Sequence, residues 1–329
     1  MSGKRSYGWV PDRPDQRDYL YKTIRPVVRL PKKVDLREFC SIVENQEALG
    51  SCTANALAGN LEYLDKKGVL DFAYMKRRNV RSNTINTNAI NNLSLRGSDS
   101  GRSNLKNGIA SPQKQWRARN DINCVCIRRA PIQYSSSDRE SLLRKRSREV
   151  SDLGYEDVSR LFIYYNERVL EGSVDYDSGA SLRDGIKTLR KQGACWEKTW
   201  PYLIEHFDRK PPKNCYIEAK KHCIESYHRI NSLPEMLTCL AEGYPFVFGF
   251  TVYESFQSQR VAKTGVANMP KKKEKAIGGH AVLAVGYNQK QKRFLVRNSW
   301  GPKWGQDGYF TMPYEYLETL SADFWTIRK

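Results

Sequence analysis

Long hydrophobic stretches are absent from this sequence of 329 residues. No segment approaches the roughly 20 consecutive apolar residues that span a membrane. The N-terminal stretch, residues 1–30, is polar and has no apolar core of the kind found in secretory signals. We therefore expect no membrane insertion, and we favour a cytoplasmic or virion-packaged protein over a secreted one.

Acidic residues and paired metal ligands are also scarce. The chain has 36 Asp and Glu against 55 Lys and Arg, which gives a formal net charge of +19. Cys124 and Cys126 form a Cys-x-Cys pair, but no second pair follows at metal-ligand spacing and no histidine lies nearby. Free thiols are therefore favoured over a zinc site, and we expect no cofactor.

Most of the excess charge falls in one segment. Residues 76–150 hold 17 Lys and Arg against 5 Asp and Glu, so their net charge is 17 − 5 = +12. High charge without sustained apolar periodicity favours disorder. Three roles are open: a tolerated surface loop, a polybasic tether for nucleic acid or another anionic partner, or a processing segment. Few aromatic residues are placed for base stacking, which argues against nucleic acid.

Four residues supply the parts needed to break an acyl bond: Gln46, Cys52, His280 and Asn298. A thiolate attacks, and an imidazole can hold the proton and return it to the leaving amine. An asparagine can orient the imidazole through its other ring nitrogen. A glutamine amide, together with the backbone N–H of Cys52, can donate to an oxyanion.

The segment after Cys52 predicts a helix. Its apolar residues fall on one helical face: Ala54, Leu57, Ala58, Leu61 and Leu64. Gly68 is a natural end for this helix. Ser51 is a plausible N-cap. Cys52 would then lie at the positive end of the helix dipole, which favours the thiolate.

Together these motifs resemble the papain-like cysteine peptidases of the cathepsin family. Residues 31–37 resemble the start of the mature enzyme, and residues 298–310 resemble its C-terminal signature. The similarity covers roughly residues 31–70 and 154–329. It implies that Cys52 is the nucleophile, His280 the base, Asn298 the orienter and Gln46 the oxyanion donor, with a protein or peptide as substrate. It also implies that Trp300 shields the His–Asn hydrogen bond.

The departures from that family concern the cleft. Leu49 replaces a disulfide cysteine, which favours a reducing compartment, and Thr53 replaces a tryptophan. Residues 177–180 stand in for a missing Gly-Cys-x-Gly-Gly segment, so Gly179 is the candidate for backbone pairing with substrate. These changes resemble the divergent microbial and viral branch typified by xylellain and the cathepsin B-like enzymes.

Further candidates for the substrate cleft follow from the resemblance. Gly279, beside His280, is expected to line the cleft. The floor of the main side-chain pocket is expected near residues 321–324. If Asp323 points into that pocket, basic side chains are accepted; if Ala322 does, apolar ones are. The apolar alternative is favoured.

The spacing of the motifs indicates an insertion. The family places its histidine roughly 130–150 residues after the nucleophile. Here the gap is 280 − 52 = 228 residues, and the basic segment accounts for the difference.

The remaining chain predicts an α+β fold with two lobes. Helices are expected at 159–170, after Ser181 and after Ser232, and strands at 246–253, 281–287 and 293–298. A helical lobe of about 40–225 thus precedes an antiparallel, barrel-like β lobe of about 226–329, with the active site between them.

Residues around Trp9–Tyr21 precede the peptidase-like region. We expect them either to cover the cleft, as a zymogen segment does, or to pack on the second lobe. Two other functions keep the same fold: a basic binding or virion-structural protein with a masked site, and acyl transfer to an amine or thiol. Loss of Cys52 separates a peptidase from a binder.

Overall fold

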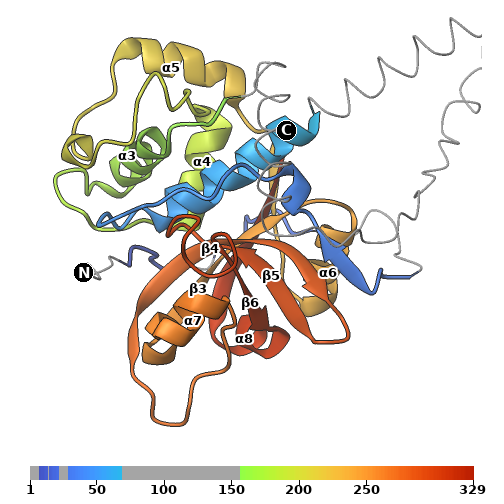
Figure 1. Cartoon of the computed structure of the whole chain (residues 1–329). Helices are drawn as coiled ribbons and strands as arrows, with labels where there is room; N and C mark the ends of the chain where they lie inside the picture. The colour runs from blue at the N-terminus through green and yellow to red at the C-terminus, as the bar shows by residue number, and fades with distance from the viewer. Residues whose placement is uncertain (1–6, 14, 22–28, 69–155) are drawn as a thin grey trace, which may run out of the picture. The chain divides into compact units, whose positions relative to one another are not determined.

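The computed structural model describes residues 7–13, 15–21, 29–68 and 156–329. The basic segment of about residues 76–150, with Cys124 and Cys126, lies outside the described residues. In Figure 1 the helix at 52–68 and the helices labelled α3, α4 and α5 lie above an antiparallel sheet formed mainly by residues 226–329. The predicted α+β class and its helices-then-sheet order are confirmed.

The helical lobe is built around the helix at 52–68, drawn in blue in Figure 1. Three more helices complete it: α3 (Arg160–Glu171), α4 (Leu182–Lys191) and α5 (Lys213–Ala219), with short 3-10 turns η3 (Ile204–His206) and η4 (Lys220–His222). Ser159 and Ser181 cap α3 and α4 through their side chains, as their positions in the sequence predict.

The described residues form a sheet of seven strands: β1 (Lys33–Asp35), β2 (Ser226–Arg229), β3 (Phe246–Tyr253), β4 (Ala276–Asn288), β5 (Arg293–Arg297), β6 (Tyr309–Pro313) and β7 (Ser321–Arg328). Their order is β2-β7-β3-β4-β5-β6, with β1 on β4, and all the pairings between these strands are antiparallel. Because β4 is long, it places His280 near one end of the sheet and still pairs with three neighbours.

Short helical elements flank the sheet. They are η1 (Arg37–Phe39), α6 (Leu233–Ala241), η5 (Glu254–Gln257), α7 (Gln259–Thr264) and α8 (Tyr314–Thr319). Ser232 caps α6, with Pro234 in its first turn.

The alternation of side chains along β3 separates two cores. Phe246, Phe248 and Phe250 point into the core formed with α6, α7 and α8. Val247 points the other way, into the core shared with the helical lobe, as do Leu283 of β4 and Trp325 of β7. One face of the sheet therefore forms the boundary between the lobes.

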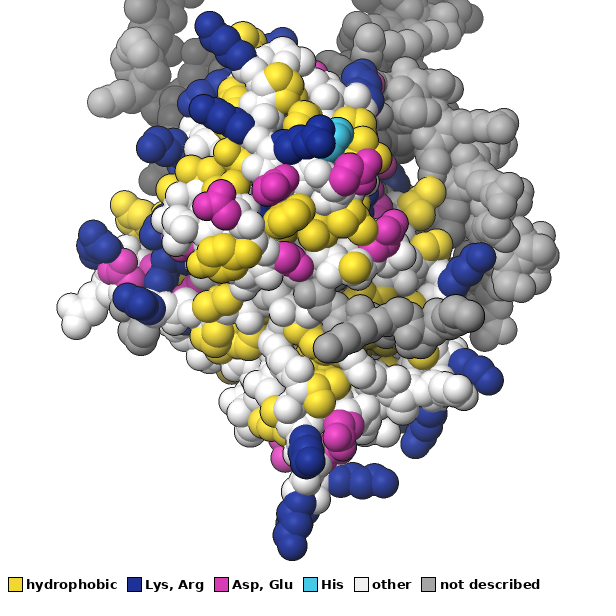
Figure 2. Space-filling model, turned by 90° about the vertical axis from the view of Figure 1, so that its left-hand side faces the viewer, with side chains coloured by type: hydrophobic (Ala, Val, Ile, Leu, Met, Phe, Trp, Pro, Cys, Tyr) yellow, Lys and Arg dark blue, Asp and Glu magenta, His cyan; other side chains and the backbone are white. Residues whose placement is uncertain are grey.

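The view in Figure 2 shows hydrophobic side chains mixed with acidic and basic ones over the helical lobe. Lysines gather at the lower tip of that view, on the loop between α7 and β4, which contains Lys271, Lys272 and Lys273. Among the described residues, no helix combines the length and apolar character needed to cross a membrane.

Candidate active site

Cys52 begins its helix at the boundary between the lobes. The carbonyl of Ser51 accepts the first helical hydrogen bond, from the N–H of Asn55 at 3.0 Å, which places Ser51 at the N-cap. The Ser51 hydroxyl contacts Tyr202 and the Asn55 side chain. The Cys52 side chain is fully buried.

Burial dominates the electrostatics of Cys52. It raises the pKa of the thiol to about 11, although hydrogen bonds from the backbone N–H groups of Ala281, Gly8 and Thr53 favour the thiolate. The bond from Ala281 places the sulfur beside the residue that follows His280. The bond from Gly8 shows that the N-terminal segment lies directly on the sulfur.

His280 and Asn298 form a hydrogen-bonded pair. Nε2 of His280 lies 2.8 Å from Oδ1 of Asn298, and both side chains are buried. The indole of Trp300 stacks on the imidazole, with ring centroids 4.9 Å apart and an angle of 25° between the ring planes. The Oδ1 atom also accepts the N–H of Ser299 at 2.9 Å, which fixes the orientation of the amide.

Gln46 is held next to this pair. Its Oε1 accepts the Ser299 hydroxyl at 2.5 Å, and its Nε2 donates to the carbonyl of Leu49 at 2.9 Å. An amide nitrogen carries two N–H groups, so a second donor belongs to the same atom. The structure thus brings Gln46 and Cys52, from one loop, together with His280 and Asn298 from two other parts of the chain.

The N-terminal segment, residues 7–13 and 15–21, is called the strap. It crosses the site between the lobes. The N–H of Trp9 donates to the carbonyl of Gly279 at 3.1 Å, the N–H of Ala180 donates to the carbonyl of Gly8 at 2.7 Å, and the N–H of Val10 donates to the carbonyl of Ala180 at 3.0 Å. Both edges of the strap are therefore paired, one to each lobe.

Glycine is required where the strap approaches the walls. A Cβ on Gly8 would lie 1.6 Å from the carbonyl oxygen of Gly50. A Cβ on Gly179, where φ is +71°, would lie 2.0 Å from the oxygen of Gly8. The strap pairs with Ala180, and the N–H of Gly179 donates to the Tyr164 hydroxyl at 3.1 Å. Pairing of Gly179 with a substrate stays a prediction.

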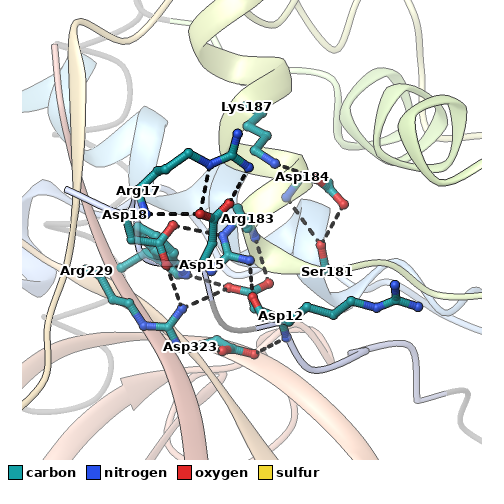
Figure 3. A network of polar contacts seen from close by, with 12 residues as sticks. Asp12, Asp15, Arg17, Asp18, Ser181, Arg183, Asp184, Lys187, Arg229 and Asp323 are labelled. Carbon is teal, nitrogen blue, oxygen red and sulfur yellow. Dashed lines mark hydrogen bonds and ion pairs between the residues drawn. The ribbon is translucent and has the colours of Figure 1, made fainter. Parts of the chain in front are cut away.

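An ionic latch fastens the strap, as Figure 3 shows; we give this name to Asp12, Asp18, Arg183, Arg229 and Asp323. Arg183 on α4 binds Asp18 at 2.5 Å, and Arg229 on β2 binds both Asp18 and Asp323 at 3.2 and 3.1 Å. The N–H of Asp12 donates to Asp323 at 2.8 Å. Asp323 is therefore occupied by the latch and does not point freely into a substrate pocket.

Two residues that the sequence did not single out organise the nucleophile loop. The Asp177 carboxylate accepts the N–H of Gly50 at 2.9 Å, and the Tyr164 hydroxyl binds the same carboxylate. Burial, followed by Asp177, raises the pKa of Tyr164. Asp177 belongs to residues 177–180, which the sequence analysis places at the cleft. Its contact with Gly50 could not be predicted, because it depends on the fold.

A third missed residue lies behind the nucleophile. Glu167 of α3 is fully buried and accepts the Thr53 hydroxyl at 2.8 Å. Burial raises the pKa of Glu167 well above its usual value, which favours the neutral acid. Within the described part of the chain, no group of three or more His, Cys, Asp or Glu side chains is arranged to hold a metal ion.

Comparison with known proteins agrees with this geometry. A family model described as papain family cysteine protease matches residues 177–320. An uncharacterized peptidase C1-like protein of Acanthamoeba polyphaga mimivirus is 52% identical over 182 residues, which cover 52% of this chain and 58% of that protein. Bovine pro-cathepsin H is 32% identical over 121 residues, 36% of this chain and 35% of its own. The chain thus spans less than two thirds of these curated relatives.

A solved structure matches over the whole length. Xylellain, a cysteine protease from Xylella fastidiosa, superposes with a TM-score of 0.66 and 32% sequence identity, covering 100% of this chain and 99% of that one. The resemblance inferred from the motifs is confirmed: the chain belongs to the papain family of cysteine proteases.

Proposed function

We propose that the protein is a cysteine peptidase in which Cys52 is the nucleophile, His280 the base, Asn298 the orienter and Gln46 an oxyanion donor. One observation carries the proposal. The N–H of Ala281 lies close enough to the Cys52 sulfur to lower the pKa of the thiol, while the adjacent His280 ring is held by Asn298 at 2.8 Å. Nucleophile, base and orienter are thus joined through consecutive contacts.

The chemistry follows in balanced steps. The Cys52 thiolate attacks the peptide carbonyl carbon, so a C–S bond forms and the carbonyl oxygen becomes an oxyanion. Nε2 of Gln46 and the N–H of Cys52 donate to this oxyanion. The C–N bond then breaks, and the His280 imidazolium gives its proton to the leaving amine. Water, deprotonated by His280, then attacks the thioester carbon. The C–S bond breaks, the peptide leaves as a carboxylic acid, and the proton held by His280 returns to the Cys52 sulfur.

Asn298 and Trp300 prepare His280 for this role. Nε2 of His280 donates its proton to a hydrogen bond with Oδ1 of Asn298. Nδ1 of His280 is then the nitrogen that exchanges a proton with Cys52. The stacked indole of Trp300 excludes water from the hydrogen bond between His280 and Asn298. Both residues position the base without adding charge to it.

We further propose that the strap keeps the enzyme latent. It covers the sulfur, and the burial that results keeps the thiol protonated at neutral pH. The strap runs parallel to the strand-like backbone at Ala180. It presents the N–H of Gly8 to Cys52, while the Gly8 carbonyl is bound by Ala180. Because Ala180 holds the Gly8 carbonyl oxygen and the Gly8 N–H serves Cys52, we expect the seated strap to act as an inhibitor and not as a substrate.

The test uses full-length chains and a peptidyl epoxide that alkylates activated thiols. In Gly8→Val the strap cannot seat, because the valine Cβ would overlap the carbonyl of Gly50. We expect Cys52 to be labelled at least about tenfold faster in Gly8→Val than in the parent chain, since the thiol is no longer desolvated. Val10→Ala is the matched control, because its side chain is 45% exposed and its backbone pairing is retained.

Mass mapping and peptide hydrolysis decide the outcome. Labelling at Cys52 among the eight cysteines, with hydrolysis that Cys52→Ala abolishes, supports the peptidase. Equal labelling of the parent chain and Gly8→Val would refute the latency. A folded Gly8→Val chain whose Cys52 resists labelling would refute the peptidase, and the masked binding or virion-structural protein would take its place.

A further inference from the structure

Arg183, in the first turn of α4, uses its guanidinium to hold the strap. Its Nε and Nη2 donate to the Asp18 carboxylate at 3.1 and 2.5 Å, and its Nη1 donates to the carbonyl of Arg13. Among the described residues, all the hydrogen bonds of this guanidinium go to the strap. The side chain is only 8% exposed while the strap is seated. Release of the strap therefore uncovers a guanidinium and removes its acceptors.

Two further donors face the same place from the sheet. Nη1 of Arg229 donates to Asp18 at 3.2 Å, and the indole N–H of Trp325 donates to Asp12 at 2.8 Å. The guanidinium carbons of Arg183 and Arg229 lie 5.6 and 5.2 Å from the centre of the Trp325 ring. Figure 3 shows the two arginines reaching the strap carboxylates from α4 and β2. Two cations and an indole donor thus converge from three elements of the enzyme body.

The seated strap gives this cluster an excess of negative charge. Asp12 and Asp18 come from the strap and Asp323 comes from β7, so three carboxylates share two guanidinium groups. When the strap leaves, Asp323 is the one latch carboxylate that remains, bound to Arg229 at 3.1 Å. One acidic side chain from another peptide would then balance the charge, because it supplies the second carboxylate for two guanidinium groups.

The path of the strap relates this cluster to the reacting bond. His280 gives its proton to the leaving amine, so the leaving part of a substrate lies on the side of His280. Tyr7 occupies that side, since its ring centroid lies 6.2 Å from that of the imidazole. The retained part of the substrate then extends the other way, along the path from Gly8 to Asp12. Asp12 is four residues beyond Gly8, which covers the Cys52 sulfur.

We infer that Arg183, Arg229 and Trp325, together called the acid site, bind an Asp or Glu side chain of the substrate once the strap has left. The acidic residue is the one four positions before the residue whose carbonyl is attacked. Arg183 determines the preference, because its guanidinium loses its acceptors when the strap leaves. The inference rests on the proposed peptidase function and adds a substrate class: peptides that are acidic upstream of the cleaved bond.

The preference is electrostatic, so a peptide with Asn in place of Asp isolates it. Asn has nearly the shape of Asp but lacks its charge, and charge-assisted hydrogen bonds are roughly twice as strong as neutral ones. We expect kcat/KM for the Asp peptide to exceed that for the Asn peptide by at least about tenfold at low ionic strength. The ratio should fall as the NaCl concentration rises, because salt screens the attraction.

The experiment compares acetyl-Xaa-Ala-Ala-Leu-Ala coumarin amides, with Xaa as Asp, Asn or Lys. The enzyme is the full-length chain with Gly8→Val, Asp12→Ala and Asp18→Ala, called the latch-free chain. The two alanine substitutions are needed because the carboxylates of an unseated strap would compete for Arg183 at high effective concentration.

Substitutions at Arg183 test its role in the latch-free chain. Arg183→Gln should reduce the ratio of kcat/KM for the Asp and Asn peptides to less than about threefold. Arg183→Glu should invert the preference, so that the Lys peptide is cleaved faster than the Asp peptide. Arg190→Gln and Arg190→Glu are the matched controls, because Arg190 lies in the last turn of the same helix with an exposed side chain and changes the net charge equally.

A binding measurement separates this inference from the proposed function. Calorimetry on the latch-free chain with Cys52→Ser, using the corresponding acetyl-peptide amides, needs no catalysis. Tighter binding of the Asp peptide than of the Asn peptide, lost with Arg183→Gln and kept with Arg190→Gln, supports the acid site even if no peptide is hydrolysed, a result that refutes only the peptidase. Equal hydrolysis or equal binding of the two peptides, or a preference that survives Arg183→Gln, overturns the inference, whereas cleavage of both peptides would still support the peptidase.

Discussion

Opposing effects meet at the Cys52 sulfur. Three backbone N–H groups favour the thiolate, and burial opposes them strongly enough to raise the pKa to about 11. The donors from Ala281 and Thr53 belong to the enzyme body, whereas the donor from Gly8 and much of the cover belong to the strap. We therefore expect the reactivity of Cys52 to depend on whether the strap is seated.

Gln46 offers a test at the scale of one residue. In the chain opened by Gly8→Val, we expect Gln46→Ala to lower kcat for peptide hydrolysis by about 100- to 1,000-fold, because one oxyanion donor is lost. Alkylation by iodoacetamide develops no oxyanion, so its rate at Cys52 should change less than about threefold if Gln46 acts on the oxyanion. A parallel fall in both rates would show instead that Gln46 only holds Ser299 and the nucleophile loop in place.

The strap is the element whose behaviour the sequence motifs predicted least. The motifs left open whether it covers the cleft or packs on the second lobe. In the structure it pairs with both lobes, and its latch joins α4, β2 and β7. The latch contains two guanidinium groups and three carboxylates. This excess of negative charge favours binding of a proton by one carboxylate when the strap is seated.

Asp12 gives the latch its pH dependence. Burial, and then the Asp323 carboxylate, raise the pKa of Asp12 from 3.8 to about 6 in the seated strap. Because the seated form binds this proton more tightly than the released form, seating is strongest below about pH 4 and weakens as pH rises through 6. The seating constant should fall by up to roughly 100-fold across that window.

Hydrogen exchange measures how the seating of the strap depends on pH. The amides of Trp9 and Val10, bonded to Gly279 and Ala180, should lose protection between pH 4 and pH 7 after correction for intrinsic exchange rates. Asp12→Asn keeps the acceptor for Trp325 and should abolish the dependence. Protection that rises with pH, or an unchanged profile in Asp12→Asn, would contradict the role of Asp12.

The two lobes are joined by a buried ion pair next to Asn298. Arg297 of β5 reaches across to the helix at 52–68, where its Nη1 lies 3.8 Å from Glu62, and its Nη2 donates to the carbonyl of Ile42 at 2.7 Å. A Cβ on Gly59 would lie 1.9 Å from the guanidinium. Gly59 thus admits the arginine that sets the distance between the helix of Cys52 and the strand before Asn298.

Removal of Glu62 should destabilise the whole molecule. Burial and the nearby Asp157 raise the pKa of Glu62 to about 7, so the test is made at pH 8, where the carboxylate is charged. Glu62→Ala leaves a buried guanidinium unpaired, at a cost of about 3–5 kcal/mol. At about 2–4 °C per kcal/mol, Tm should fall by roughly 6–20 °C in a thermal melt.

Asp15→Asn is the control for that melt. Asp15 forms an ion pair of the same kind with Arg17, whose side chain is 88% exposed, so its loss should leave Tm unchanged. A Glu62→Ala chain with the Tm of the parent would show that the pair between Arg297 and Glu62 does not hold the lobes together.

The sequence by itself determined the class of fold, the helix that begins at Cys52, the serine caps of α3, α4 and α6, strand β3, and the family. These depend on local periodicity, capping and motifs, which act over a few residues. Strands β6 and β7 and the short helices were not predicted, because their residues are selected by pairing across the sheet; β7 is interrupted by a bulge at Asp323, where φ is +57°.

Only the tertiary structure decided how the site is covered. The pairing of Trp9 with Ala180, the ion pair of Asp323 with Arg229 and the contact of the Trp9 indole with Gly249 all join residues more than 90 positions apart. A glycine in a strand pattern shows that backbone is exposed there, but not what approaches it. That information exists only once distant strands are in register and the strap lies between the lobes.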